Sequence, residues 1–443
     1  MLLRFILENI ASFKEAVEFN TFPSSKSHSH ENHKITCGHA AVLRMSAIYG
    51  ANGAGKSNLL QALKFLQTLV KAETIRKTTF YDNPTFKFDS QYIDKPSGLA
   101  IEFYNNSNIF YYNIEFTPEE IILEELLLSK KNKDIELFTH KGTDISINAG
   151  YVGEGITEQF QDALKRLVRP DMLLLSFLGK YYSDESPLVA DAYQWLVEKL
   201  QLVLPDSRHF FVPHLLDTDS DFTDLVNTTL PELKTGIAKL DVKREQIIEE
   251  DVKSETLKKY IKKAKEHPGE PQALYDRKTD DDINIIYEDG KVYMKTLTAI
   301  HKNTDGSEVE ISLCDESDGT RRLIDYMPLL YSIIKKDMVY VVDEIERSIH
   351  PILIKDIVRK LSESKTAKGQ LIFTTHESGL LDQNIFRPDE IWFAQKDTEQ
   401  ATRLYPLSDF NTHKTANIEK GYLDGRYGGI PFLSNLKDLH WEV

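Results

Sequence analysis

Residues 50–57 form the motif in this chain whose residue types and spacing are best suited to chemistry. They read GANGAGKS and match the Walker A pattern G-x-x-x-x-G-K-[ST]. In such a loop backbone N–H groups curl around phosphate oxygens, Lys56 can reach the β- and γ-phosphates, and Ser57 can offer its hydroxyl to Mg²⁺. A strand-like run at 41–49 precedes the loop and a helix-periodic run at 58–70 follows it. This context favours a phosphate site over a plain glycine-rich turn.

Two carboxylates later in the chain supply the metal and water chemistry that the loop lacks. The run MVYVVDE at 338–344 is apolar and ends in acids, which is the Walker B pattern. At the end of a buried strand, Asp343 would hold Mg²⁺ directly or through water. Glu344 would orient or deprotonate the attacking water. Apolar strands that end in acids are common, so the pairing with a Walker A loop is what makes this one informative.

A histidine follows the next apolar run. GQLIF at 369–373 predicts a buried strand, and His376 lies just after it in TTHES. There its imidazole could form a hydrogen bond with a γ-phosphate or with the attacking water. A lone histidine is usually structural, but its place after the strand that follows Walker B favours a catalytic role.

A small polar turn opens a helix predicted at 314–334. The turn consists of Ser317, Asp318, Gly319 and Thr320. A helix N-terminus exposes unpaired N–H groups and the positive end of the helix dipole, which together attract anions. Taken alone, the turn is better explained as a helix cap by Ser317 or Asp318.

The elements around these motifs begin with antiparallel strands. Alternating apolar and polar residues over the first 22 positions predict a hairpin around ASFKE. Four β-rich runs predict a meander at 99–106, 108–117, 121–130 and 134–140.

A His/Ser-rich stretch at 23–34 separates the hairpin from the Walker loop. Its His28, His30 and His33 could form a metal tract. Because no cysteine or carboxylate cluster accompanies them, a flexible surface loop is the favoured interpretation.

Helices are predicted from about 155 to 270, because apolar residues recur there at three- and four-residue spacing. The charged part at 243–272 predicts a solvated helix that ends in a Pro/Gly linker. Its lysines could contact DNA phosphates or a partner; they are Lys258, Lys259, Lys262, Lys263 and Lys265. Strands are expected again at 283–302 and 308–313, followed by alternating helices and buried strands typical of an α/β core.

The composition is that of a soluble globular protein with two or three domains. The chain has 443 residues, of which 41% are hydrophobic and 28% charged. No apolar run reaches the length of about 18 residues that a membrane span needs. The two cysteines, Cys37 and Cys314, lack metal-site spacing and fit a reducing cytoplasm. A net charge of −15 argues against a surface that coats nucleic acid, although a local basic groove stays open.

The order of the motifs resembles that of ABC-type ATPase heads. Walker A, an S-x-G-[TQ] signature at 317–320, Walker B with a following Glu, S-[LI]-H-P at 348–351 and T-T-H at 374–376 occur in that order. The resemblance is closer to the branch that contains RecF, SMC proteins and OLD-family ATPases. The opening RFILENIASFKEAVEF is similar to the first hairpin of this branch. The closing GYLDGRYGGIPFL resembles the end of stand-alone bacterial ATPases of the branch, many of them encoded in phage-defence systems.

This resemblance implies a fold and a domain organisation. It covers roughly 1–130 and 285–443 of the chain. The implied fold is α/β, an ABC-type ATPase head whose mixed core sheet is flanked by helices, with an antiparallel β subdomain and a helical insertion. The domains would be a first head lobe at 1–140, the helical insertion at 141–282 and a second head lobe at 283–443.

The resemblance also implies roles for single residues, with ATP and Mg²⁺ as the bound groups. The phosphates would be bound by Gly50, Asn52, Gly53, Gly55, Lys56 and Ser57. The metal would be held by Ser57 and Asp343, and the catalytic residues would be Lys56, Glu344 and His376. The signature residues Ser317, Gly319 and Thr320 would act on ATP held by a second protomer, and Ser348 and His350 lie in the stretch that matches the D-loop. A Q-loop glutamine is not assigned, because Gln91 sits in a poor pattern.

In heads of this kind two protomers enclose two ATP molecules, which implies a C2 homodimer or a higher even oligomer.

The function favoured is an ATP-driven switch in anti-phage defence that controls a separate effector. This effector would be a nuclease or toxin encoded elsewhere, since no nuclease motif is evident after residue 380. A RecF-like ATPase that binds DNA in repair or maintenance is the second function, and the acidic charge weighs against it. A scaffold with little turnover is the third, and intact Glu344 and His376 argue against it. A transport ATPase fits least, and no membrane partner is expected.

Overall fold

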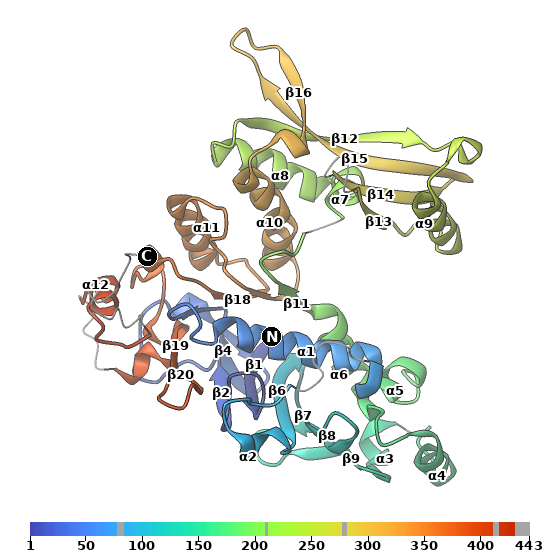
Figure 1. Ribbon diagram of the computed structural model, residues 1–443, viewed down its shortest axis with the longest axis vertical. Helices are drawn as coiled ribbons and strands as arrows, with labels where there is room; N and C mark the ends of the chain where they lie inside the picture. The colour runs from blue at the N-terminus through green and yellow to red at the C-terminus, as the bar shows by residue number, and fades with distance from the viewer. Residues whose placement is uncertain (78–83, 154, 209–210, 277–280, 411–415, 430–443) are drawn as a thin grey trace, which may run out of the picture. The chain divides into compact units, whose positions relative to one another are not determined.

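The computed structural model describes residues 1–77, 84–153, 155–208, 211–276, 281–410 and 416–429 (Figure 1). The chain forms two compact units. The first unit comprises residues 1–205, 336–345 and 355–443, and the second comprises residues 206–335 and 346–354. The domain boundaries predicted from the sequence, at residues 140 and 282, separate the two ATPase head lobes from the insertion between them. They are not tested by this division into compact units and stay a prediction.

A six-stranded core sheet lies at the centre of the first unit. Its strands follow the order β11-β17-β18-β5-β19-β20, and all neighbours are parallel except β19 and β20. They are β5 (Met45–Tyr49), β11 (Leu200–Val203), β17 (Val339–Val342), β18 (Gln370–Thr374), β19 (Ile391–Lys396) and β20 (Thr402–Pro406). β5, β17 and β18 are buried along their whole length. Parallel strands covered on both faces are expected to be largely apolar. β17 is entirely apolar, whereas β5 also buries Ser46 and β18 buries Gln370 and Thr374.

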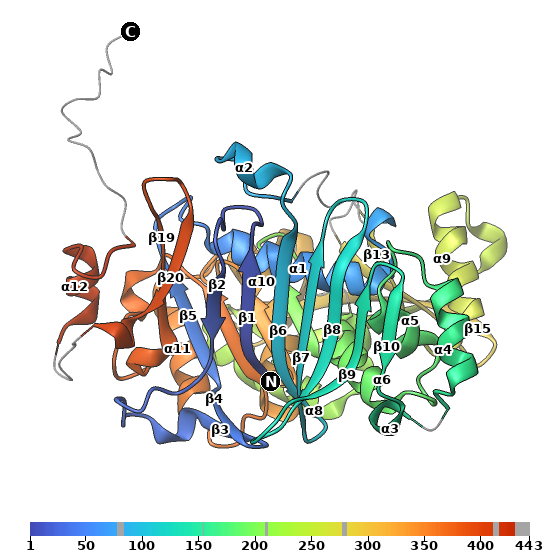
Figure 2. The ribbon, with the colours of Figure 1, turned by 90° about the horizontal axis from the view of Figure 1, so that it is seen from below.

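A seven-stranded antiparallel sheet forms a second layer of the first unit. Figure 2 shows its strands side by side, in the order β10-β9-β8-β7-β6-β1-β2. They are β1 (Leu2–Glu8), β2 (Val17–Asn20), β6 (Ser97–Asn105), β7 (Asn108–Phe116), β8 (Ile121–Ser129), β9 (Ile135–Lys141) and β10 (Asp144–Ile147). The antiparallel pairing of β1 with β2 and of β6 through β9 confirms the predicted hairpin and meander.

Helix α1 (Lys56–Ala72) joins the two sheets into one hydrophobic core. Its Leu60 and Leu63 belong to the same buried cluster as Ile48 of β5 and Phe5 of β1. The apolar positions recur along α1 on more than one face, which suits a helix packed between layers. The Walker loop is therefore anchored at both ends in the core of the first unit.

Smaller elements complete the first unit. The two-stranded sheet consists of β3 (Lys34–Cys37) and β4 (Ala40–Leu43). The helices are α2 (Ser90–Ile93), α3 (Ala149–Val152), α4 (Glu158–Leu167), α5 (Leu174–Tyr181), α6 (Pro187–Gln194) and α12 (Ile418–Leu423), while α11 (Pro351–Glu363) spans the boundary between the units. None of the helices in the described ranges combines the length and apolar character that crossing a membrane requires.

The described part of the closing motif, residues 421–429, packs on β19. The rings of Tyr422 and Tyr427 stack on Phe393 with centroids 5.6 and 5.9 Å away. Gly428 has a φ of 69°, and a Cβ there would lie 2.3 Å from the Gln395 side-chain oxygen, so the turn favours glycine at this position. Residues 430–433 of the motif lie outside the described residues.

The second unit is an antiparallel sheet with helices. The sheet order is β12-β15-β14-β13, and β16 also pairs with β15. The strands are β12 (Ile237–Gln246), β13 (Gln272–Asp276), β14 (Asp281–Glu288), β15 (Lys291–Lys302) and β16 (Glu308–Ser312). The helices are α7 (Val212–Thr218), α8 (Ser220–Glu232), α9 (Glu255–Glu266) and α10 (Asp318–Lys335).

The prediction of a helical insertion is wrong for part of its length. β11, β12 and β13 are strands within the stretch expected to be helical. β12 is rich in helix-forming Lys, Arg and Glu, but its pairing with the long strand β15 overrides that weak propensity. The charged segment forms only the 12-residue helix α9, whose Ile261 and Ala264 are buried against Ile285 and Val292.

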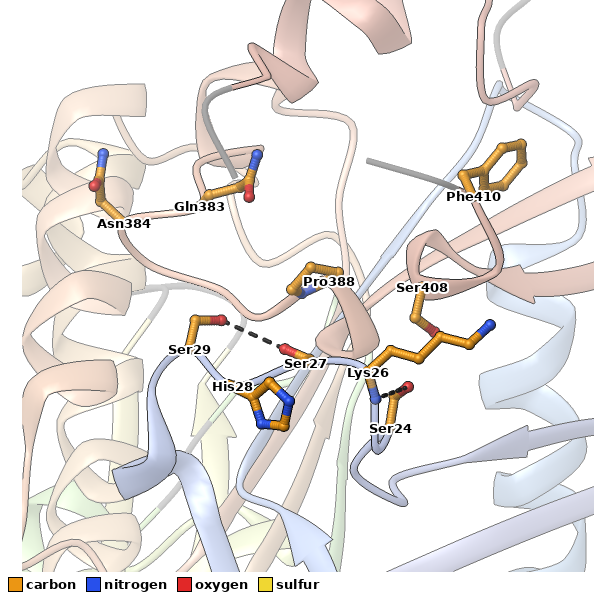
Figure 3. A pocket seen from close by; sticks show the side chains of 10 residues that line it. All are labelled: Ser24, Lys26, Ser27, His28, Ser29, Gln383, Asn384, Pro388, Ser408 and Phe410. Atoms are coloured by element: carbon orange, nitrogen blue, oxygen red, sulfur yellow. Dashed lines mark hydrogen bonds between the residues drawn. The ribbon is translucent and has the colours of Figure 1, made fainter. Parts of the chain in front are cut away.

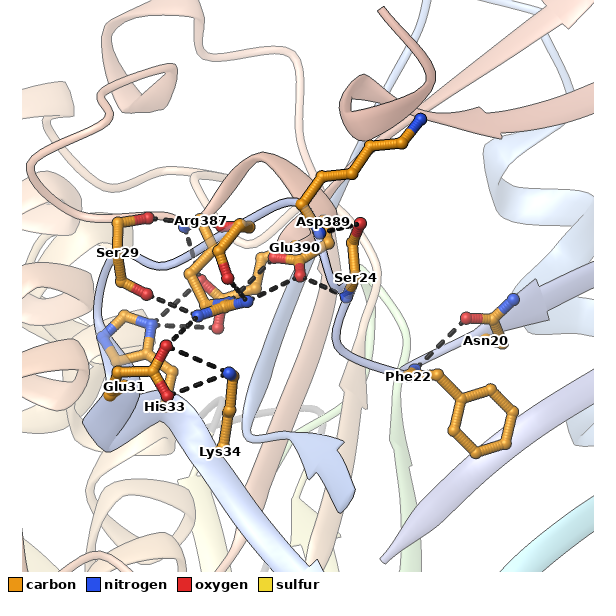
Figure 4. Close-up of polar contacts among 12 residues, drawn as sticks. Asn20, Phe22, Ser24, Ser29, Glu31, His33, Lys34, Arg387, Asp389 and Glu390 are labelled. Atoms are coloured by element: carbon orange, nitrogen blue, oxygen red, sulfur yellow. Dashed lines mark hydrogen bonds and ion pairs between the residues drawn. The ribbon is translucent and has the colours of Figure 1, made fainter. Parts of the chain in front are cut away.

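The prediction of a flexible surface loop at 23–34 is also wrong in part. His33 is 1% exposed and its Nδ1 lies 2.9 Å from both carboxylate oxygens of Glu390 (Figure 4). Burial raises the pKa of the Glu390 carboxyl, against the opposing effect of His33. The stretch is held because a buried acid close to β19 provides a partner for the histidine. Among the described residues no group of three or more His, Cys, Asp or Glu is placed to hold a metal ion.

Candidate functional site

The Walker loop passes so close to neighbouring strands that two of its positions require glycine. A Cβ on Gly55 would lie 2.1 Å from the Thr402 hydroxyl oxygen, and one on Gly50 would lie 2.5 Å from the Ala394 carbonyl oxygen. Gly55 also has a φ of 105°, in the region that side chains disfavour. Gly53 has a φ of 76°, and a Cβ there would meet nothing within 4 Å. The inner side of the loop is thus packed, while Asn52 and Gly53 are exposed.

A short hydroxyl network supports the loop from the packed side. The Thr402 hydroxyl donates to the Ala54 carbonyl at 2.9 Å and lies 2.7 Å from the Ser12 hydroxyl. The Asn58 amide donates to the same Ser12 oxygen at 2.8 Å. Sequence reasoning did not find Ser12 or Thr402, because serine and threonine are common and these two are 390 residues apart.

Lys56 is 5% exposed and is folded back over the loop. Its ammonium donates to the Gly50 carbonyl at 2.6 Å and to the Ala51 carbonyl at 3.2 Å. It also lies 3.4 Å from Nδ1 of His376. A buried ammonium needs acceptors, and phosphate oxygens supply stronger ones than carbonyls do. Ser57, in the first turn of α1, is half-buried.

The predicted Walker B acids lie at the end of β17. Asp343 is 3% exposed, accepts a short hydrogen bond from the Thr374 hydroxyl, and donates its own N–H to the Val203 carbonyl of β11 at 2.8 Å. The Glu344 N–H donates to the same Thr374 oxygen at 2.8 Å. Glu344 has a φ of 49°, a left-handed conformation that costs on the order of 1 to 3 kcal/mol at a residue other than glycine. Thr374 therefore holds both acidic residues in place.

The sheet order brings these residues to one edge. β18 lies between β5 and β17, and all three run parallel. The Walker loop, His376 and the acids follow the carboxyl ends of these three strands. In open α/β sheets ligands bind at this edge. The structure thus places the sequence-predicted residues of the first unit together: Lys56, Asp343, Glu344 and the exposed His376.

The second unit holds the remaining predicted residues. The Ser317 hydroxyl accepts from the Thr320 N–H at 3.1 Å and lies 2.9 Å from the Thr320 hydroxyl, so it caps the start of α10. A Cβ on Gly319 would lie 2.7 Å from the Ser348 carbonyl oxygen. The signature turn and the predicted D-loop are therefore in contact, and His350, two residues after Ser348, is exposed.

The unassigned Q-loop candidate Gln91 lies in α2 of the first unit, where it is exposed.

A glycine loop between a buried strand and a helix, with paired acids two strands away, is the arrangement of a P-loop ATPase. The chain belongs to the family described as "AAA domain, putative AbiEii toxin, Type IV TA system", whose sequence profile matches residues 45–382. No protein with a curated function matches the chain.

Three solved structures of SMC heads are similar over most of the chain. The SMC head bound to the C-terminal winged-helix domain of ScpA is 14% identical, with a TM-score of 0.44, and the alignment covers 91% of this chain and 97% of that one. The SMC head domain from Thermotoga maritima is 11% identical, with a TM-score of 0.39 and coverages of 91% and 98%. The Pyrococcus furiosus Smc head with an extended coiled coil, bound to the C-terminal domain of ScpA, is 13% identical, with a TM-score of 0.41 and coverages of 96% and 98%.

Proposed function

We propose that the chain binds ATP with Mg²⁺ and hydrolyses it to ADP and phosphate. The observation that carries this proposal is the meeting of Lys56, His376 and the Asp343–Thr374–Glu344 group at the carboxyl edge of one parallel sheet. Lysine, imidazole and paired carboxylates beside a glycine loop are the groups that phosphoryl transfer to water requires.

The donor set fits a magnesium ion. Mg²⁺ prefers oxygen ligands, and this edge offers the Asp343 carboxylate and the Ser57 hydroxyl. When bound, the ion would neutralise charge on the β- and γ-phosphates. Asp343 would hold it directly or through water. Loop N–H groups between Asn52 and Ser57 would bind the phosphates, with Lys56 moving from the loop carbonyls to the phosphate oxygens.

The remaining residues divide the hydrolysis step between them. Water attacks the γ-phosphorus, the bond to the β–γ bridging oxygen breaks, and ADP leaves with that oxygen. Glu344 orients the water and accepts its proton. His376 forms a hydrogen bond with the γ-phosphate, and Lys56 stabilises the charge that develops on it.

We further propose that the site is completed by a second copy of the chain. Ser317, Gly319, Thr320 and Ser348 would contact the ATP held by the partner's Walker loop, in a C2 dimer. The contact of Gly319 with Ser348 supports this proposal, since it forms one surface from two separate motifs. The cap made by Ser317 leaves the first turn of α10 ordered for such a contact.

A mixing experiment tests both proposals. Lys56→Ala should abolish ATP binding and Ser317→Arg should block hydrolysis with ATP binding retained, so each purified variant is inactive. A mixed dimer carries one site whose two halves are both wild type. Mixing should therefore restore phosphate release, and each mixed dimer should reach at most about half the rate of a wild-type dimer. Lys71→Ala, an exposed lysine on the same helix, is the matched control and should stay active. ATP binding by Lys56→Ala would refute the site, and two inactive variants that stay inactive after subunit exchange would refute the shared site.

In the cell, we propose that ATP-driven closure controls a separate effector protein in anti-phage defence, in the cytoplasm. The family description, which names a toxin of a toxin–antitoxin system, supports this setting. A RecF-like role on DNA is the alternative. The five lysines of α9 are exposed, but three of them pair with glutamates, which weakens the case for phosphate binding. Stimulation of the ATPase by duplex DNA would favour the alternative, and turnover below one ATP per hour would favour an assembly scaffold.

A further inference from the structure

A polar pocket lies at the edge of the core sheet opposite the Walker loop. Its volume is about 330 Å³, and its walls come from segments 24–29, 383–388 and 408–410 of the first unit (Figure 3). The short turn at 388–390 precedes β19, and the one at 407–409 follows β20, which is antiparallel to β19. Both turns therefore lie at the same edge of the sheet, which is the amino end of β19 and the carboxyl end of β20. The site described above lies at the carboxyl edge, so the pocket is separate from it.

The lining of this pocket is unusual for so acidic a chain. It contains four serines, the amide side chains of Gln383 and Asn384, Lys26 and His28. No carboxylate is among the described lining residues, although the chain has 69 acidic and 54 basic residues. Lys26 is exposed and forms no ion pair with any residue in the described ranges. Hydroxyls, amides and a lysine without acids form an environment for an anion.

The serine-rich wall is held in shape by a buried guanidinium (Figure 4). Arg387 is fully buried; it donates to the Ser29 carbonyl and, at 3.1 Å, to the Ser27 carbonyl. Asp389 neutralises it at 2.8 Å and accepts the Ser24 N–H at 2.6 Å. The backbone of all three serines is thereby fixed before any ligand arrives. Such preorganisation lowers the entropy cost of binding.

The pocket also has an apolar part. Pro388 and Phe410 contribute to the lining, and Figure 3 shows the Lys26 side chain extending toward Ser408, on the same side as Phe410. The volume is at the lower end of the range for small-molecule sites, about 300 to 1,000 Å³. A planar ring can contact the apolar residues while a phosphate reaches the hydroxyls and Lys26. We propose that this pocket binds a small phosphate-bearing ligand of mononucleotide size.

The pocket is connected to the proposed catalytic histidine through one segment. The chain from His376 to Glu390 links the carboxyl edge of β18 to the amino edge of β19 and lines the pocket on the way. Asp382 pairs with Lys355 at 3.1 Å, and the Gln383 carbonyl lies 2.8 Å from Nε2 of His30. A ligand that contacts Gln383 would bias this segment and with it His376. This regulatory step rests on the proposed ATPase, whereas the binding step does not.

Binding is tested on the full chain carrying Lys56→Ala, so that the Walker loop does not compete. AMP, inorganic phosphate and adenosine are titrated calorimetrically. Saturable binding of AMP is expected, weakened at least tenfold by Lys26→Glu and unchanged by Lys131→Glu, an equal charge change on the exposed β8–β9 turn. If inorganic phosphate binds as tightly as AMP, the pocket recognises the phosphate group alone, and the mononucleotide size of the ligand is refuted. Three results would overturn the proposal. They are adenosine binding as tight as that of AMP, no AMP binding at millimolar concentration, and an AMP affinity in Lys26→Glu equal to that of the parent chain.

Regulation is tested separately, on the chain with an intact Walker loop. AMP is expected to change the rate of ATP hydrolysis at saturating ATP, and Lys26→Glu should abolish the change while leaving the basal rate intact. Normal AMP binding in the Lys56→Ala chain with no effect on hydrolysis would reject the coupling and keep the site. If the chain hydrolyses no ATP at all, the proposed function fails and the calorimetric result still decides the pocket.

Discussion

The Lys56 ammonium lies 3.4 Å from Nδ1 of His376, and this contact links the Walker loop to the end of the neighbouring strand. An ammonium can only donate a hydrogen bond, so Nδ1 must act as acceptor. The neutral imidazole then has its proton on Nε2, where it can be donated to a phosphate oxygen. The lysine and the histidine thus orient each other, and in the proposed function both would contact the same phosphate.

Replacement of His376 by alanine should reduce turnover more than ATP affinity. The histidine is exposed at the strand end and contributes nothing to the core, so folding should be unaffected. Loss of one donor to the developing charge costs on the order of 100-fold in kcat. Steady-state phosphate release and ATP titration measure the two effects, with the exposed His39→Ala as control. Equal kcat in both variants would remove His376 from the mechanism.

Replacement of Glu344 by glutamine should trap the ATP-bound form. Glutamine keeps the size of the side chain and the N–H bond to Thr374 but cannot accept the proton of water. We expect hydrolysis to fall about 100-fold or more. Size-exclusion chromatography with ATP should show dimers that wild-type protein forms only transiently. Glu119→Gln, on an exposed turn, is the control; wild-type turnover in Glu344→Gln would assign the base elsewhere.

Alanine at Gly55 should destabilise the fold more than alanine at Gly53. Both glycines have positive φ, so both substitutions carry a similar backbone penalty of about 1 kcal/mol. Only at Gly55 would the new methyl group collide with Thr402, which adds an overpacking cost of about 1 to 3 kcal/mol. Urea unfolding of the two variants gives the difference. A more stable Gly55→Ala would show that the loop is not packed against β20 as described.

The pH dependence of stability should report a buried pair in the antiparallel sheet. His140 and Glu124 are fully buried, with the His140 Nδ1 3.2 Å from the Glu124 carboxylate and Nε2 2.8 Å from the Gly142 carbonyl. Burial lowers the pKa of His140, but its bonds to Glu124 and Gly142 outweigh burial and raise the pKa above its usual value near 6.5. Its contribution to stability is therefore complete below pH 6.5 and is lost as pH rises through the folded-state pKa.

The test compares wild type with His140→Gln in urea unfolding between pH 5.5 and 9. The free energy of unfolding of the wild type should decrease above pH 6.5 relative to that of the variant. Parallel curves for the two proteins would mean that His140 is neutral in the folded state. Because Glu124 also accepts the N–H groups of Leu174 and Leu175 at the start of α5, the loss should be accompanied by faster amide exchange there.

The parts of this fold that the sequence predicts well are those with local signals. The strand, glycine loop and helix around Lys56 are contiguous, and the apolar runs before Asp343 and His376 end abruptly in polar residues. The pairing of the first strands and the meander follows from alternation and short turns. These patterns depend on neighbours along the chain, so they are visible without tertiary structure.

The parts that the sequence did not predict depend on distant partners. β11 continues an apolar pattern of helical spacing and becomes a strand because Leu200 and Val203 pair with β17, almost 140 residues further on. His33 is buried because its partner is the buried carboxylate of Glu390, three residues after the buried Arg387. Ser12 and Thr402 support the Walker loop without any pattern of their own. None of these contacts leaves a periodic signal.

The position of β5 has a consequence for synthesis on the ribosome. Its two neighbours in the sheet are β18 and β19, and β19 ends about 350 residues after β5. At about 5 to 20 residues per second, β5 emerges about 20 to 70 seconds before its last partner. For most of that interval the strand ahead of the Walker loop has neither edge paired, because β18 is also completed late, at residue 374. Premature termination anywhere before residue 391 therefore leaves a fragment in which β5 has an open sheet edge.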